Sequence, residues 1–117
     1  MVSRPGEAVS GSNTGRPIMV LLDALGKRWA LRLLWELNRQ QPASFRELQA
    51  RCENISPTSL TTRLKDLRDS HLVELTGSGY QLTEGGRTLS ALLAPLDAWA
   101  QDWARRFEAA DPTLPQD

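Results

Sequence analysis

The chain has 117 residues with one cysteine and one histidine, and its fourteen basic and fourteen acidic residues leave a formal net charge of zero. This length suits a single domain with a modest core, and the lone cysteine and histidine exclude both an internal disulfide and a zinc site built from Cys and His. No apolar run approaches the roughly 18 residues of a transmembrane helix, and the first residues lack the apolar segment of a secretory signal, so we expect no membrane partner and a cytoplasmic location.

The charges are distributed unevenly along the chain. From Lys27 to Arg68 there are nine basic and four acidic residues, whereas residues 69–117 contain three basic and eight acidic residues. A basic segment of this kind is typical of proteins that bind a phosphate-rich partner. The alternative is chance clustering of charge on solvated faces.

The composition predicts one folded domain between two tails. Residues 1–15 are rich in Gly, Ser and Pro and are predicted to be a disordered tail. Residues 110–117 contain two prolines and are predicted to be flexible. The folded domain is therefore expected over residues 16–109.

Two helices are predicted at the start of this domain. Apolar residues recur on one face of residues 17–25, and Gly26 provides a helix end. Apolar residues continue at helical spacing over residues 27–39, where we expect Trp29 in the core and Trp35 at the edge of the core.

A pair of helices with strong start signals follows. Ser44 is a good N-cap for a short helix ending near Cys52, and Glu47 three residues later completes a capping box. After a brief turn, Ser56 and Pro57 provide the N-cap and the first helical position of a helix within residues 55–72. This second helix has one thin apolar stripe, made of Leu60, Leu64 and Leu67. The two helices and the short turn between them form a helix-turn-helix pattern.

The sequence pattern then changes from helix to strand. Residues 73–76 and 80–83 alternate in polarity around a Gly-Ser-Gly turn, which predicts a small hairpin. A last helix is predicted from Glu84, capped by the threonine before it, and Pro95 within this helix predicts a kink or a break. The predicted fold is mainly α with a small β-hairpin, arranged as a winged helix-turn-helix.

Four segments in order carry a family resemblance: LGKRWALRLLWEL at residues 25–37, SFRELQ at 44–49, ISPTSLTTRLKDL at 55–67, and YQLTEGGRTL at 80–89 followed by LDAWA at 96–100. Together they resemble the HxlR-type winged helix-turn-helix regulators, bacterial and archaeal transcription factors related to the MarR type. The resemblance implies a homodimer, built by its N- and C-terminal helices, that binds double-stranded DNA at an inverted repeat. It also implies association with the nucleoid and no cofactor.

The resemblance places the DNA contacts mainly in the N-terminal half of the helix within residues 55–72. Basic residues before that helix are candidate phosphate contacts, with solvated surface as the alternative, and the serine in the hairpin turn is a candidate contact of the wing. The alternative for Arg63 is a structural role, in which it supports Asp66 or a neighbouring helix. The full predicted DNA-binding set is Lys27, Arg28, Arg46, Ser56, Thr58, Ser59, Thr62, Arg63, Lys65 and Ser78.

Large apolar residues on the terminal helices are predicted to form the dimer interface. The last helix has more of them than a small domain can readily cover, although packing on the first helix within one monomer and an aromatic ligand pocket are alternatives. A small-molecule effector could bind near this seam, but no residue identifies one. The predicted interface residues are Leu21, Leu22, Leu92, Leu96, Trp99, Trp103 and Phe107.

The chain departs from the family pattern at three positions. No cysteine precedes Cys52, which we expect to be a small buried residue, so the family's N-terminal cysteine sensor cannot be carried over. The wing is short, and His71 stands where the family usually has a glycine.

No catalytic or metal-binding constellation is present, so we expect no enzyme activity. The alternative function is a winged-helix protein-interaction module without specific DNA binding.

Overall fold

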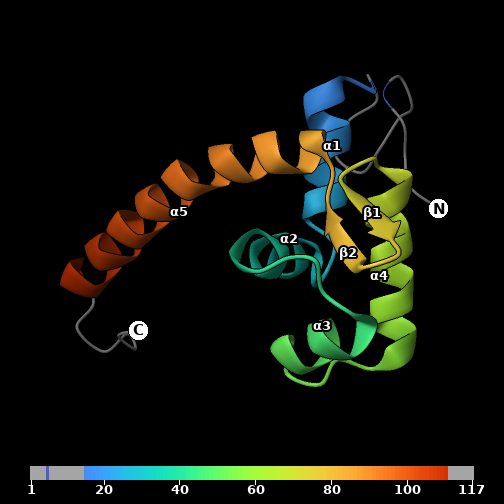
Figure 1. Ribbon diagram of the computed structural model, residues 1–117. Helices are drawn as coiled ribbons and strands as arrows, with labels where there is room; N and C mark the ends of the chain where they lie inside the picture. The colour runs from blue at the N-terminus through green and yellow to red at the C-terminus, as the bar shows by residue number, and fades with distance from the viewer. Residues whose placement is uncertain (1–4, 6–14, 111–117) are drawn as a thin grey trace.

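Five helices and one hairpin make up the part of the chain that the structure, a computed structural model, describes, which is residue 5 and residues 15–110. Predictions for residues 1–4, 6–14 and 111–117 lie outside the described residues. The fold is mainly α with a two-stranded antiparallel hairpin, as predicted (Figure 1). The elements in order are α1 (Pro17–Leu25), α2 (Ala30–Arg39), α3 (Phe45–Arg51), α4 (Pro57–Asp69), β1 (Val73–Thr76), β2 (Gly79–Leu82) and α5 (Glu84–Ala110).

The core is built around α2, which lies at the centre of the arrangement (Figure 1). Leu33, Leu34 and Leu37 of this helix are fully buried, as their helical spacing predicted. The leucine stripe of α4 and the first and last apolar residues of the hairpin, Val73 and Leu82, pack into the same cluster. Burial of these side chains is the main driving force that holds the helix-turn-helix against α2.

Both helices of the helix-turn-helix begin where the sequence predicted. Ser44 Oγ accepts a hydrogen bond from the Glu47 N–H at 3.1 Å, and the Glu47 carboxylate accepts one from the Ser44 N–H at 3.0 Å, which completes the capping box. Ser56 Oγ caps α4 by accepting from the Ser59 N–H at 3.1 Å, and Pro57 is the first helical residue. These caps satisfy backbone donors that would otherwise lack partners.

The start of α2 was predicted wrongly. The helix begins at Ala30 rather than Lys27, because Trp29 adopts a left-handed conformation with φ of 75° that a continuous helix does not allow. Trp29 still packs against the core, as predicted. Trp35 is 46% exposed and lies further outside the core than expected.

The hairpin is attached to the segment between α2 and α3. The two strands pair in the register that places Val73 opposite Leu82, and Tyr80 forms a further bridge to Ala43. The Ala43 N–H donates to the Tyr80 carbonyl at 2.9 Å, and the Tyr80 N–H donates to the Ala43 carbonyl at 2.8 Å. The Gln41 side chain accepts from the Leu82 N–H at 2.6 Å. These contacts hold the wing against the body of the domain.

The last helix starts as predicted and continues through its proline. Thr83 Oγ1 accepts from the Gly86 N–H at 3.0 Å and caps α5. The sequence predicted a kink or a break at Pro95. The helix is not broken there, and Figure 1 shows a gradual bend along α5. Pro95 and Ala91, whose carbonyl loses its helical partner, are both exposed, so water can satisfy that carbonyl.

Candidate nucleic-acid interface

One face of α4 is anchored in the core and the opposite face is open to solvent. Leu60, Leu64 and Leu67 are each at most 2% exposed. The exposed residues on the other side include Thr58, Thr62 and Lys65. Two hydroxyls and one amino group are therefore presented by a helix whose position is set by three buried leucines, which is the arrangement needed to read the DNA major groove.

Lys65 and Asp69 form an exposed ion pair one turn apart on this open face. Lys65 Nζ lies 2.7 Å from the Asp69 carboxylate. This hydrogen bond is the main cause that raises the pKa of Lys65 and lowers the pKa of Asp69. Because both side chains are exposed, the pair is weak in water and the amino group can exchange its carboxylate partner for a phosphate.

Arg63 lies on the flank of α4, where it forms a more buried ion pair. Its Nη1 donates to the Asp66 carboxylate at 2.8 Å, with the two side chains 18% and 14% exposed. The Nε atom is buried and has no hydrogen-bond partner among the described residues. This geometry matches the bracing role that the sequence left open, and it turns part of the guanidinium away from the outer face.

Ser56 and Ser59 are exposed at the start of α4, but their hydroxyls are occupied with each other. Ser56 Oγ donates to Ser59 Oγ at 2.9 Å while it caps the helix. The two hydroxyls form one small polar cluster beside the backbone N–H groups of the first turn. Helix N-termini favour negatively charged groups such as phosphates.

Three predicted phosphate contacts form no salt bridge to another described residue, and neither does Arg68, which was not among the predicted contacts. Lys27, Arg28 and Arg46 are in this state, whereas five other basic residues between residues 27 and 68 pair with carboxylates of their own helices. The Arg28 guanidinium lies 5.6 Å from the centre of the Trp29 ring, within range of a cation–π interaction. These ion pairs within the chain leave less unpaired positive charge between residues 27 and 68 than the residue count suggested.

The wing presents Ser78 at its exposed tip. Thr76 Oγ1 accepts from the Ser78 N–H at 3.1 Å and donates to the Gly79 carbonyl at 3.0 Å, which organises the turn. The tip carries no basic side chain, so the polar groups that it exposes are the Ser78 hydroxyl and the backbone.

Several side chains that hold α2 and α3 together beneath the candidate interface were missed at the sequence level. Glu36 of α2 is buried and accepts hydrogen bonds from Arg32 at 2.8 Å and Arg39 at 3.1 Å. Arg32 also donates to the Arg51 carbonyl at the end of α3, at 2.7 Å. The i, i+4 spacing of the Arg32–Glu36 pair is visible in the sequence, but the burial of Glu36 and the link to α3 depend on tertiary contacts.

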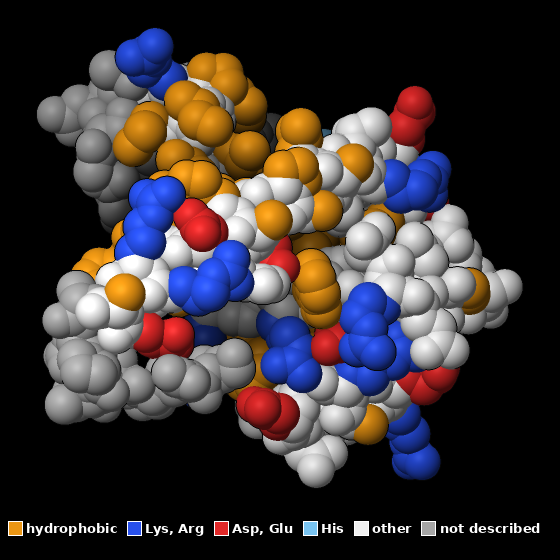
Figure 2. Space-filling model, turned by 90° about the vertical axis from the view of Figure 1, so that its left-hand side faces the viewer, with side chains coloured by type: hydrophobic (Ala, Val, Ile, Leu, Met, Phe, Trp, Pro, Cys, Tyr) orange, Lys and Arg blue, Asp and Glu red, His pale blue; other side chains and the backbone are white. Residues whose placement is uncertain are grey.

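Most residues predicted to form the dimer interface are exposed. Leu92, Leu96 and Trp99 are 70%, 58% and 58% exposed, and Trp103 and Phe107 are about half exposed. Along α5, the Trp103 ring stacks on the Trp99 ring and meets the Phe107 ring edge to face. Figure 1 shows α5 extending away from the other elements, and Figure 2 shows exposed hydrophobic side chains on the side from which it projects. On α1, Leu22 is exposed, whereas Leu21 packs partly against the core.

Three further findings concern the described residues. They contain no group of three or more His, Cys, Asp or Glu side chains that could hold a metal ion. None of the helices in the same part of the chain is long and apolar enough to cross a membrane. Cys52 is fully buried, as predicted, and this burial is the main cause that raises the pKa of its thiol.

The capped helix pair and the attached hairpin define a winged helix-turn-helix protein. A family profile described as HxlR-like helix-turn-helix matches residues 24–108. The chain therefore belongs to the HxlR family of transcriptional regulators, which bind DNA, as the sequence motifs indicated. No protein with a curated function matches the chain significantly.

Solved structures support this assignment. The quinone-bound form of YodB from B. subtilis is 34% identical, with a TM-score of 0.66, and the alignment covers 74% of this chain and 97% of YodB. A possible HxlR family transcriptional factor from Thermoplasma volcanium GSS1 is 31% identical, with a TM-score of 0.66 and coverage of 76% and 85%. The reduced form of the transcriptional regulator YodB from B. subtilis is 29% identical, with a TM-score of 0.65 and coverage of 84% and 97%.

Proposed function

We propose that the protein is a homodimeric regulator that binds an inverted-repeat operator through the outer face of α4. The observation that carries this proposal is the exposure of Thr58, Thr62 and Lys65 on one face of a helix held by buried leucines. In a twofold dimer, two such helices about 34 Å apart would enter successive major grooves. The threonine hydroxyls would then provide sequence preference, and Lys65 would contact the phosphate backbone.

Phosphate contacts would supply most of the affinity. Lys27, Arg28 and Arg46 are not paired with carboxylates of other described residues, so their charges are available to the DNA backbone. Ser56 and Ser59 would approach the backbone at the helix N-terminus. The remaining predicted contacts, Arg63 and Ser78, belong to the proposal and are tested by the same binding assay.

A second copy of the chain is the proposed occupant of the apolar face of α5. Leu96, Trp99 and Trp103 are each about half exposed or more on a helix that projects from the domain. Monomeric proteins rarely expose a contiguous patch of this kind. In a twofold dimer the same patch on both subunits faces itself, so each copy covers the other.

A small-molecule effector is also part of the proposal. The related YodB structure is described as quinone-bound, which supports a regulator whose DNA binding responds to a ligand. We propose that the protein acts in the cytoplasm on the nucleoid, without a cofactor and without catalysis.

The test is an electrophoretic mobility shift assay with DNA from the region upstream of the gene that encodes this protein. Thr62→Ala should weaken operator binding by roughly five- to tenfold, as expected for the loss of one specific contact of about 1 kcal/mol. Thr88→Ala is the matched control, because Thr88 is an exposed threonine on α5, and it should bind like the wild type. Lys65→Ala should reduce the slope of log K against log salt by about one.

The alternative function is a protein-interaction module, and it makes the opposite prediction. The internal pairing of Arg32, Arg39, Arg51, Arg63 and Lys65 favours it, since paired charges attract phosphates less strongly. If no genomic fragment binds better than random DNA at ~0.1 M salt, the regulator proposal fails and the interaction module replaces it.

A further inference from the structure

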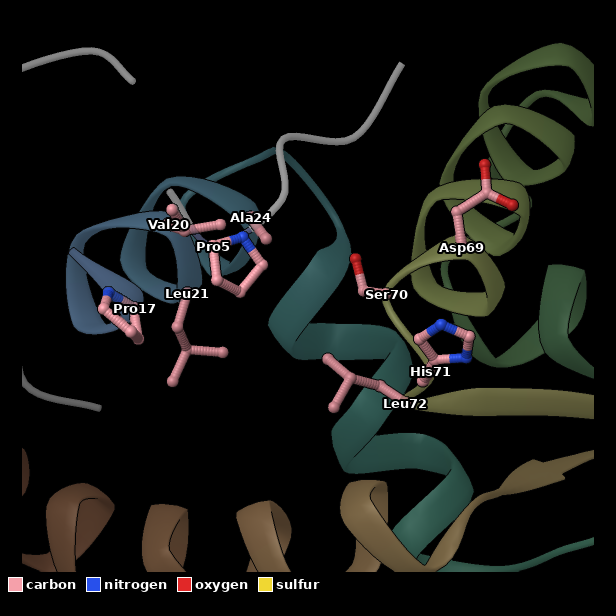
Figure 3. Close-up of a pocket in the computed structure, with 9 residues that line it drawn as sticks. All are labelled: Pro5, Pro17, Val20, Leu21, Ala24, Asp69, Ser70, His71 and Leu72. Atoms are coloured by element: carbon pink, nitrogen blue, oxygen red, sulfur yellow. The ribbon is translucent and has the colours of Figure 1, made fainter. Parts of the chain in front are cut away.

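A cavity of about 450 Å³ lies between α1 and the end of α4 (Figure 3). Its α1 wall is apolar and consists of Pro17, Val20, Leu21 and Ala24. Figure 3 shows the Leu72 side chain extending from the opposite wall toward the side on which α1 lies. The volume falls within the range of roughly 300–1,000 Å³ that is typical of small-molecule sites.

The opposite wall is a junction held by hydrogen bonds. His71 adopts a left-handed conformation with φ of 59°, and its carbonyl accepts from Thr83 Oγ1 at 2.7 Å. The Leu72 N–H donates to the Leu67 carbonyl at 3.0 Å, and the Leu72 carbonyl accepts from the Thr83 N–H at 3.0 Å. The end of α4, the start of the wing and the start of α5 therefore form one connected unit on this side of the cavity.

The polar groups at the cavity define the kind of ligand that fits. Ser70 provides a hydroxyl that makes no hydrogen bond to another described residue, and His71 provides an imidazole. Asp69 also lines the cavity, and its hydrogen bond with Lys65 lowers its pKa, so the carboxylate stays ionised at neutral pH. An apolar molecule with a hydroxyl or amino group suits these surroundings. A carboxylate would lose water of hydration there without gaining a cation, because none of the described lining residues is Lys or Arg and Lys65 is already paired with Asp69.

We propose that this cavity binds an uncharged, mostly apolar molecule with one hydroxyl or amino group, and that binding changes operator affinity. The second half of this inference rests on the proposed function. α1 carries the cavity residues on one side and exposed Ile18 and Leu22 on another, so it lies between the cavity and the proposed dimer face. A ligand that contacts both walls links the position of α1 to the end of the recognition helix α4.

The binding half is tested with 4-methylphenol as the probe and 4-methylbenzoate as its anionic counterpart. Both are titrated into the ¹⁵N-labelled full chain without DNA, and amide shifts are followed. We expect saturable shifts centred on residues 17–24 and 69–72 with 4-methylphenol, and roughly tenfold weaker binding of 4-methylbenzoate. Shifts confined to α5, or no saturable shifts with either probe, would overturn the site.

Two variants localise the binding. Ala24→Phe places a ring in the cavity and should abolish the shifts, while Ala50→Phe puts the same ring on an exposed residue of α3 and should leave them unchanged. Ser70→Ala is a milder variant that keeps the cavity open and should weaken 4-methylphenol binding several-fold by removing one hydrogen-bond partner. Circular dichroism confirms that each variant is folded. Equal binding by wild type, Ala24→Phe and Ser70→Ala would contradict the assignment.

The regulatory half is tested by repeating the mobility shift with 4-methylphenol present. We expect a several-fold change in operator affinity for the wild type and none for Ala24→Phe. Saturable probe binding with unchanged operator affinity would refute the regulatory link. Absence of operator binding by the wild type without probe would refute the proposed function, while the DNA-free titration would still decide whether the cavity is a ligand site.

Discussion

Arg63 Nη1 and the Asp66 carboxylate are 2.8 Å apart on the flank of α4, and both side chains are mostly shielded from solvent. On the same helix, the exposed Lys65–Asp69 pair lies on the outer face, with its side chains 71% and 46% exposed. The two ion pairs therefore have different consequences, because burial reduces the screening of charge by water. The first should contribute to stability and the second should remain available to a binding partner.

Arg63→Ala should lower the free energy of unfolding by about 1–2 kcal/mol, because Asp66 would lose a charged hydrogen-bond donor in a poorly solvated place. Lys65→Ala is the control on the same helix and should leave stability unchanged within error. Urea unfolding of both variants measures the difference. Equal stability of the two variants would mean that the Arg63–Asp66 pair is not a stabilising contact.

Gly86→Ala should destabilise the protein, whereas Gly85→Ala should not. A Cβ on Gly86 would collide with the Leu72 carbonyl and its backbone, while a Cβ on Gly85 would meet its nearest atom at an ordinary distance of 3.6 Å. We expect a loss of about 1–3 kcal/mol for Gly86→Ala from overpacking, and a gain of up to about 1 kcal/mol for Gly85→Ala from helix propensity. Thermal unfolding of the two variants distinguishes these outcomes, and a similar loss in both would refute the close packing of α5 on Leu72.

The capping box of α3 should contribute a pH-dependent part of the stability. The backbone N–H of Ser44 is the main cause that lowers the pKa of Glu47 below its ordinary value of 4.5. Because the folded pKa is the lower one, the stabilisation is present above pH 4.5 and is lost as the pH falls through the folded value. The stability advantage of the wild type over Glu47→Gln should therefore shrink between about pH 6 and pH 3. Urea unfolding across this range tests the prediction, and a constant difference would contradict it.

Leu96→Ala should weaken the proposed dimer, and Leu75→Ala should not. Both leucines are exposed, at 58% and 48%, but Leu96 lies on the apolar face of α5 and Leu75 lies on the wing. Loss of a leucine side chain from an interface should raise the dissociation constant by roughly tenfold or more. Light scattering across a micromolar concentration series measures the mass of each variant. A wild type that stays monomeric throughout would refute the dimer proposal.

The local structure of the recognition unit could be predicted from the sequence, because its signals act over a few residues. Ser44 with Glu47, and Ser56 with Pro57, determine where α3 and α4 begin. The leucine spacing of α4 also identified its buried face correctly. Hydrogen bonds within one helical turn and hydrophobic periodicity do not depend on distant parts of the chain, and this is why these predictions were confirmed.

The features that only the tertiary structure decided join residues far apart in the chain. The Gln41 side chain binds the backbone of Leu82, forty-one residues away, and this contact positions the wing. Trp29 adopts its left-handed conformation at the start of α2, against the helical pattern of its own segment. The cavity between α1 and Ser70 exists because two segments about fifty residues apart are held beside each other. The sequence by itself determined the caps of the helix-turn-helix, the buried face of α4 and the family. The pairing of charges and the shape of the surface depended on packing energies summed over the whole fold, which no local pattern contains.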